Sequence, residues 1–94
     1  MNIVADKQVF KDVEKLPKYI HEKVADELEK LKTATTFKEL NNIRQMEGTD
    51  EPYYRLKFGK YRFLLYYDST IDTVEIISIT HRKDTYKRHN LPWR

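Results

Sequence analysis

Three cations recur at strand spacing in residues 53–68, the stretch YYRLKFGKYRFLLYYD. Arg55 and Lys57 are two residues apart, and Arg62 follows the glycine near the middle of the stretch. Side chains two residues apart on a strand share a face, so a hairpin here would gather the three cations on one side. The nearest carboxylate in the stretch is Asp68, at its far end. Such a face could bind phosphate groups and stabilise charge that develops on their oxygens.

The C-terminal part of the chain carries the basic charge. Residues 1–52 hold nine Lys and Arg against eleven Asp and Glu, whereas residues 53–94 hold nine against four. The formal net charge of +3 therefore hides a difference between a slightly acidic part and a basic one. This asymmetry indicates a polyanion or an acidic protein as the partner of the basic part.

The end of the last expected strand adds candidates to the cationic cluster: His81, Arg82 and, four residues on, Tyr86. Cleavage of an RNA phosphodiester needs a base for the 2′-hydroxyl proton, cations for the phosphorane charge and an acid for the leaving 5′-oxygen. A tyrosine ring can stack on an unpaired base. Crowded cations disfavour one another's charged form, so Lys57 could act as the base. The cluster alone does not separate catalysis from phosphate binding. Four further cations are expected to contact RNA: Lys60, Lys83, Lys87 and Arg88.

Each candidate has a structural alternative. The Arg55, Lys57 and Arg62 side chains could be a solvated sheet face, although the helical charges come with balancing acids and these do not. A lone histidine such as His81 is more often structural than catalytic. Asp84 could pair locally with Arg82. The tail residues His89, Trp93 and Arg94 could be functional, but packing of the Trp93 ring is the better expectation.

The sequence argues against several other kinds of site. It has no paired carboxylates in the cluster, no Ser/His/Asp order and no glycine-rich phosphate loop. Three histidines without cysteine or a metal-ligand spacing argue against zinc. We therefore expect neither a metal nor a cofactor.

Two helices are expected before the hairpin. Residues 2–5 could form an opening strand, after which Asp6 caps a helix with apolar residues at positions 9, 10, 13 and 16. Pro17 ends this helix and begins a second one, about 17–32, with apolar residues at positions 20, 24, 28 and 31. A short helical turn at 37–40 and a strand around NIRQMEG follow. The β-branched run at 73–80 predicts the final strand.

These elements predict one α+β domain over residues 1–94, with an N-terminal helical hairpin on one face of a mainly antiparallel, roughly four-stranded sheet. Alternation assigns the apolar side chains of the hairpin to the face under the helices: Tyr54, Leu56, Phe58, Tyr61, Phe63, Leu65 and Tyr67. The cations then lie on the opposite, open face. An aromatic content of 13% argues against disorder. Without cysteines, a signal peptide or an apolar run of membrane-spanning length, a soluble cytoplasmic protein is expected.

The order of elements, with the hairpin YRLKFGKYRFLLYYD, the segment HRKDTYK and the helical stretch VFKDVEKLPKYIHEKV, resembles the RelE/ParE toxin superfamily over nearly the whole chain. The resemblance implies a RelE-like fold. Members of the RelE branch are endoribonucleases that cut messenger RNA, often in the ribosomal A site. A cognate antitoxin holds them inactive by covering the basic groove, and the toxin–antitoxin complex can bind operator DNA through the antitoxin.

The resemblance also assigns roles to individual residues. Arg55 and Lys57 match the paired basic residues before the turn, with Lys57 as the base. Arg62 matches the arginine that stabilises the phosphate, Arg82 the proposed general acid, and Tyr86 the ring that stacks on the substrate base. Two positions depart from the pattern, since Arg55 replaces a lysine and His81 replaces a different residue. His81 could therefore share the acid–base chemistry.

Two other functions stay open. The ParE branch shares the fold but inhibits DNA gyrase by binding, without the basic catalytic set; the presence of that set favours the ribonuclease. The third reading is a non-catalytic RNA- or protein-binding module that uses the cations as phosphate clamps, with salt-dependent binding and no cleavage.

Overall fold

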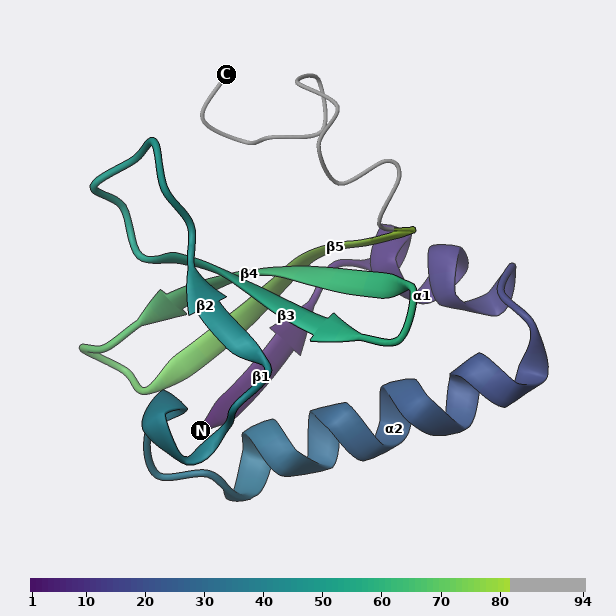
Figure 1. Cartoon of the computed structure of the whole chain (residues 1–94), viewed down its shortest axis with the longest axis horizontal. Coiled ribbons are helices and arrows are strands. Elements are labelled where there is room, and N and C mark those ends of the chain that lie inside the picture. Colours follow the sequence, from purple (N-terminus) through teal and green to yellow (C-terminus); the bar gives the residue numbers. More distant parts are fainter. Residues whose placement is uncertain (82–94) are drawn as a thin grey trace.

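The computed structural model describes residues 1–81 (Figure 1). Two α-helices, a 3₁₀ turn and five strands follow one another in the order β1 (Asn2–Ala5), α1 (Lys7–Glu14), α2 (Lys18–Thr33), η1 (Phe37–Glu39), β2 (Ile43–Gln45), β3 (Tyr53–Phe58), β4 (Tyr61–Asp68) and β5 (Thr73–His81). The expected opening strand, both helices, the helical turn, the hairpin and the final strand are confirmed, with small changes at their ends.

The sheet has five strands in the order β1-β5-β4-β3-β2. Strands β2 to β5 are antiparallel to their neighbours, whereas β1 is parallel to β5, with Ile3 opposite Val74. The α+β class is confirmed, but the count of roughly four strands was one too low. A parallel pair requires a crossover connection, and both helices and the other three strands lie between β1 and β5.

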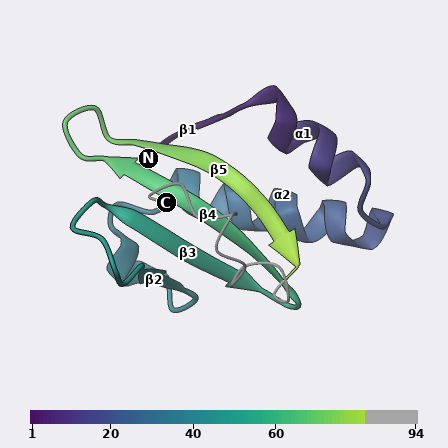
Figure 2. The ribbon, with the colours of Figure 1, turned by 90° about the horizontal axis from the view of Figure 1, so that it is seen from above.

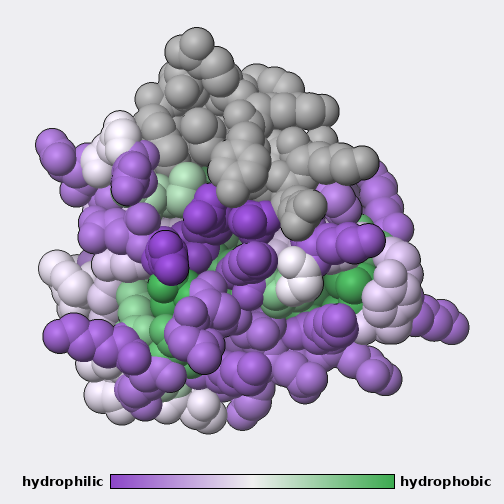
Figure 3. Space-filling model, viewed as in Figure 1, coloured by the Kyte–Doolittle hydropathy of each residue, from purple (hydrophilic) through white to green (hydrophobic). Residues whose placement is uncertain are grey.

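Both helices belong to one side of the sheet. Figure 1 shows α2 lying along one face, and Figure 2 shows the strands from the opposite side, where no helix of residues 1–81 lies over β3 and β4. Hydrophilic side chains cover most of the described surface in the view of Figure 3, with small apolar areas between them. No helix in this part of the chain is long and apolar enough to span a membrane.

The start of α1 follows from local chemistry. The Asp6 carboxylate accepts a hydrogen bond from the Gln8 backbone N–H at 3.4 Å, as expected of an N-cap residue. Val9 is buried, whereas Phe10 is 59% exposed and lines the cleft between the helices and the sheet together with Val9 and Val13. Successive residues point about 100° apart around a helix, so Phe10 lies at the margin of this face while Val9 lies in the core.

The core lies between the helices and the inner face of the sheet. Alternation along the hairpin is confirmed, because Leu56, Phe58, Phe63 and Leu65 are all buried. Residues of β5 and α2 complete the apolar cluster: Val74, Ile76, Ile79, Ile20, Val24 and Leu31. Full burial of such a side chain contributes about 1.5–3 kcal/mol, so this layer holds the strands in place for the opposite face.

Candidate functional site

The β3–β4 turn sets the geometry of the cations. Phe58 and Tyr61 are cross-strand partners, which leaves a loop of Gly59 and Lys60. Gly59 has a φ of 60°, and a glycine with positive φ at the first loop position matches a type II′ turn. This register places Lys57 directly opposite Arg62. The pairing of these two cations on one face is therefore fixed by the turn.

A groove crosses the open face over β2, β3 and β4. It has a volume of about 410 Å³, and the described residues that line it are Asn41, Asn42, Arg44, Arg55, Lys57 and Arg62. Four of the six are cations, and none of these six carries a carboxylate. The structure thus brings Arg55, Lys57 and Arg62 together as the alternation of the hairpin predicts.

Three of the lining residues were not among the sequence-based candidates: Asn41, Asn42 and Arg44. Arg44 lies on β2 directly opposite Arg55, and both also line a neighbouring hollow of about 300 Å³ with Gln45, Met46 and Glu47. The signal was present in the stretch NIRQ, where an arginine alternates with the partly buried Ile43. A strand of three residues is too short for that alternation to be recognised alone.

The groove concentrates positive charge at different depths. Arg62 is only 7% exposed and lies at the floor, whereas Lys57 and Arg44 are exposed. Like charges that lie directly opposite on neighbouring strands repel one another, and this groove has two such pairs. A bound anion would relieve this repulsion, because it offers each cation an opposite charge. The arrangement is therefore suited to phosphate groups.

His81 and Lys60, the remaining candidates among residues 1–81, do not line the groove. The His81 ring packs edge-on against Tyr61, its cross-strand partner, with ring centroids 5.5 Å apart, and His81 is not among the groove-lining residues. Lys60 is exposed in the turn. Arg82, Lys83, Tyr86, Lys87 and Arg88 lie outside the described residues, as do His89, Trp93 and Arg94.

Aromatic rings continue the same face beyond the cations. Tyr53 lies two residues before Arg55 on β3 and opposite Tyr66 on β4, with their ring centroids 5.1 Å apart. Burial raises the pKa of Tyr66, and the nearby Glu51 carboxylate raises it further. Proteins that bind single-stranded nucleic acids commonly combine aromatic rings, on which bases stack, with cations that contact the phosphates.

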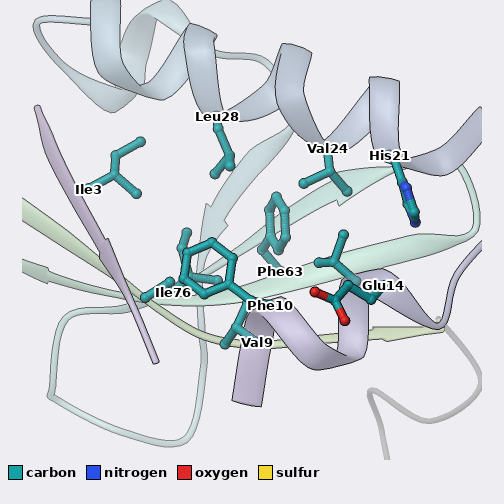
Figure 4. A pocket seen from close by; sticks show the side chains of 11 residues that line it. Ile3, Val9, Phe10, Glu14, His21, Val24, Leu28, Phe63 and Ile76 are labelled. Carbon is teal, nitrogen blue, oxygen red and sulfur yellow. The ribbon is translucent and has the colours of Figure 1, made fainter. Parts of the chain in front are cut away.

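A second cavity lies on the helix side of the sheet, between α1, α2 and the strands (Figure 4). Its volume is about 420 Å³, and side chains such as Val9, Val24 and Phe63 give it a mainly apolar lining. Glu14 and His21 are the titratable groups among its described lining residues. This cleft is suited to apolar side chains, whereas the groove on the opposite face is suited to phosphates.

Known proteins are similar to this chain in sequence and in fold. The profile of the ParE toxin family of type II toxin–antitoxin systems, parDE, matches residues 3–86. A relative from Methanocaldococcus jannaschii, whose name describes it as the toxin RelE1, is 34% identical over 88 residues, covering 92% of this chain and 94% of the relative.

Two solved structures are similar in fold. One is a RelB–RelE antitoxin–toxin complex from Methanococcus jannaschii, with a TM-score of 0.72, 23% identity, and coverage of 88% of this chain and 94% of that one. The other is an archaeal RelE–RelB complex from Pyrococcus horikoshii OT3, with a TM-score of 0.73, 23% identity, and coverage of 86% and 93%. With the family match and the sequence relative, the chain belongs to the RelE/ParE superfamily of type II toxin–antitoxin toxins.

Proposed function

We propose that this toxin is a metal-independent endoribonuclease that cleaves messenger RNA, on the ribosome, and so inhibits translation. The observation that carries the proposal is the groove, in which four cations stand over three neighbouring strands without a carboxylate among its described lining residues. Cations fixed before the substrate arrives stabilise charge that develops on a phosphate in the transition state. Membership of the RelE/ParE superfamily supports this proposal, because members of the RelE branch cut messenger RNA.

The proposed reaction uses the cations as base, charge stabilisers and acid. The 2′-oxygen attacks the adjacent phosphorus while an unprotonated Lys57 amine takes its proton, and the bond from phosphorus to the 5′-oxygen breaks. Arg62 and Arg55 neutralise the phosphorane oxygens. The leaving 5′-oxygen takes a proton from Arg82, the acid that the resemblance assigns. The products are a 2′,3′-cyclic phosphate and a 5′-hydroxyl, and Tyr86 stacks on a substrate base.

The test is cleavage by the purified protein of a single-stranded RNA, with EDTA present. We expect cyclic-phosphate and 5′-hydroxyl ends from RNA and no cut at a position that carries a 2′-deoxy sugar. Lys57→Met should abolish cleavage, while Lys11→Met, an exposed change on α1, should not. Free RNA that stays intact would call for an assay on programmed ribosomes with Mg²⁺ present, and intact messenger RNA there would refute the proposal.

A cognate antitoxin is the second proposed partner. The similar structures are RelB complexes, and the groove favours a segment with acidic side chains. Co-expression with the protein encoded beside this toxin should restore growth and yield a salt-sensitive complex that blocks RNA binding. A toxin that purifies free of that protein would contradict this partner.

Gyrase inhibition is the second candidate function, favoured by the ParE family match. Induced expression of wild type beside Lys57→Met, with messenger RNA 5′ ends mapped, separates the two. Growth arrest with new ends that vanish in the variant supports the ribonuclease. Arrest in both proteins without new ends, accompanied by DNA damage, supports gyrase inhibition.

A further inference from the structure

Asn42 makes two hydrogen bonds to the backbone of Lys57. The Lys57 N–H donates to the Asn42 backbone oxygen at 2.8 Å, and the Asn42 side-chain Nδ2 donates to the Lys57 carbonyl oxygen at 2.9 Å. Ile43 and Leu56 form the last residue pair of the β2–β3 ladder, so the Asn42 bonds extend the ladder by one step. The amide side chain takes the place that a backbone N–H has in a regular pair.

These two bonds hold Lys57 from one side. In an antiparallel strand both backbone groups of a residue face the same neighbouring strand, and those of Lys57 face Asn42. The pair that Lys57 forms with Arg62 on β4 is therefore of the type without direct hydrogen bonds, in which the side chains approach more closely. Without Asn42, repulsion from Arg62 would push on a lysine whose backbone has lost its side-chain anchor.

Asn42 is also bound to helix α2. The Asn42 Nδ2 donates a second hydrogen bond, to Glu27 Oε2 at 3.1 Å, and the Glu27 side chain is 12% exposed. Glu27 Oε1 lies 3.6 Å from Lys30 Nζ. Both amide protons of Asn42 are thus used, one on the helix and one on the sheet, so the turn before β2 cannot shift without losing a hydrogen bond.

We propose that Asn42, anchored by Glu27, is a positioning residue that fixes the Lys57 amine over the scissile phosphate. The inference rests on the proposed function, in which Lys57 is the base. A misplacement of about 1 Å at a reacting group can cost about 100-fold in rate. Asn42→Ala should therefore lower kcat by about 10- to 100-fold and leave KM within about twofold, because the cations that bind the phosphate remain.

The double variant Asn42→Asp/Glu27→Gln keeps a link to the helix but removes the hydrogen bond to the Lys57 carbonyl, and it moves one carboxylate from the helix to the groove. A glutamine at 27 can donate to an aspartate at 42, so the link to the helix is restored in reverse, while the aspartate cannot donate to the Lys57 carbonyl. We expect the stability of this variant to recover and its kcat to stay low. Full recovery of kcat would overturn the proposal, since anchoring to the helix would then be sufficient. Glu27→Gln alone, which keeps an acceptor for Asn42, should cleave like wild type.

Two further measurements keep this inference separate from the proposed function. Gln8→Ala removes another amide hydrogen bond, to Asp12 Oδ1 at 2.9 Å on α1, and should leave kcat unchanged. The amide exchange of Lys57 should be faster in Asn42→Ala and unchanged in Gln8→Ala. A wild type that cleaves RNA neither free nor on programmed ribosomes refutes the proposed function, whereas unchanged Lys57 exchange in Asn42→Ala refutes the positioning role whether or not RNA is cut.

Discussion

Arg44 and Arg55 are direct partners across the β2–β3 ladder, and both line the groove. The first lies on the edge strand of the sheet and is exposed, while the second is partly buried. Two like charges in this relation lower the stability of the sheet by some tenths of a kcal/mol. The Arg44–Arg55 pair is therefore better explained by a role in binding an anion than by a contribution to the stability of the sheet.

Replacing Arg44 should weaken RNA binding without loss of stability. For Arg44→Gln we expect the slope of log K against log salt concentration to fall by about 1, since one phosphate contact is lost. The unfolding free energy should stay equal or rise by some tenths of a kcal/mol. Binding of an uncleavable 2′-O-methyl RNA at several salt concentrations measures the slope, with Lys11→Gln as the control. An unchanged slope would remove Arg44 from the interface.

Arg62 should matter far more for cleavage than for folding. Arg62→Met retains an apolar stem of similar length at this buried position but removes the charge, so we expect kcat to fall about 100- to 1,000-fold, as when one preorganised transition-state donor is lost. Urea unfolding measured beside cleavage tests the assignment. A folded variant that cleaves at the wild-type rate would disprove it.

Truncation of the neighbouring residues Val9 and Phe10 should lower the unfolding free energy by clearly different amounts. Val9→Ala removes buried methyl groups and should lower the unfolding free energy by about 1–2 kcal/mol. Phe10→Ala acts at a largely exposed side chain and should change it by less than about 0.5 kcal/mol. Chemical denaturation of both variants decides; an equal loss would mean that Phe10 packs in the core after all.

The bond from Tyr67 to Asp72 should make stability depend on alkaline pH. The Tyr67 hydroxyl donates to Asp72 Oδ1 at 2.8 Å, and this hydrogen bond, followed by burial, raises the pKa of Tyr67 above its ordinary value of 10.0. A raised folded-state pKa adds stability that is fully present below pH 10 and is lost as the pH rises through the higher value. The stability difference between wild type and Tyr67→Phe should therefore shrink above pH 10. Tyr19→Phe, on the exposed side of α2, is the control. A difference between wild type and Tyr67→Phe that stays constant above pH 10 would contradict the linkage.

The sequence predicts the parts of this fold that depend on local patterns. Alternation in the hairpin identifies the buried face and the cationic face, because both strands are long enough to show it. The parallel pairing of β1 with β5 joins residues about seventy positions apart, and nothing local in four residues encodes it. Arg44 was missed for the same reason, since its place beside Arg55 follows only from the pairing of β2 with β3.

Burial at the site was also beyond the sequence. Arg62 belongs to the predicted set, yet its position at the floor of the groove depends on side chains from several elements. The role of Asn42 could not be predicted either, because its partners Glu27 and Lys57 lie fifteen residues before and after it. A side-chain bridge between helix and sheet appears only after both are placed.

The two-residue turn at Gly59 and Lys60 has a consequence for how this toxin can evolve. One extra residue there would shift β4 against β3 by one position and turn every β4 side chain to the other face. Arg62 would then face the core and Phe63 the solvent. Under the proposed function, substitutions in the groove can accumulate one at a time and tune which RNA is bound. A change of the turn that moves the register by one position would therefore disrupt the groove and the core together.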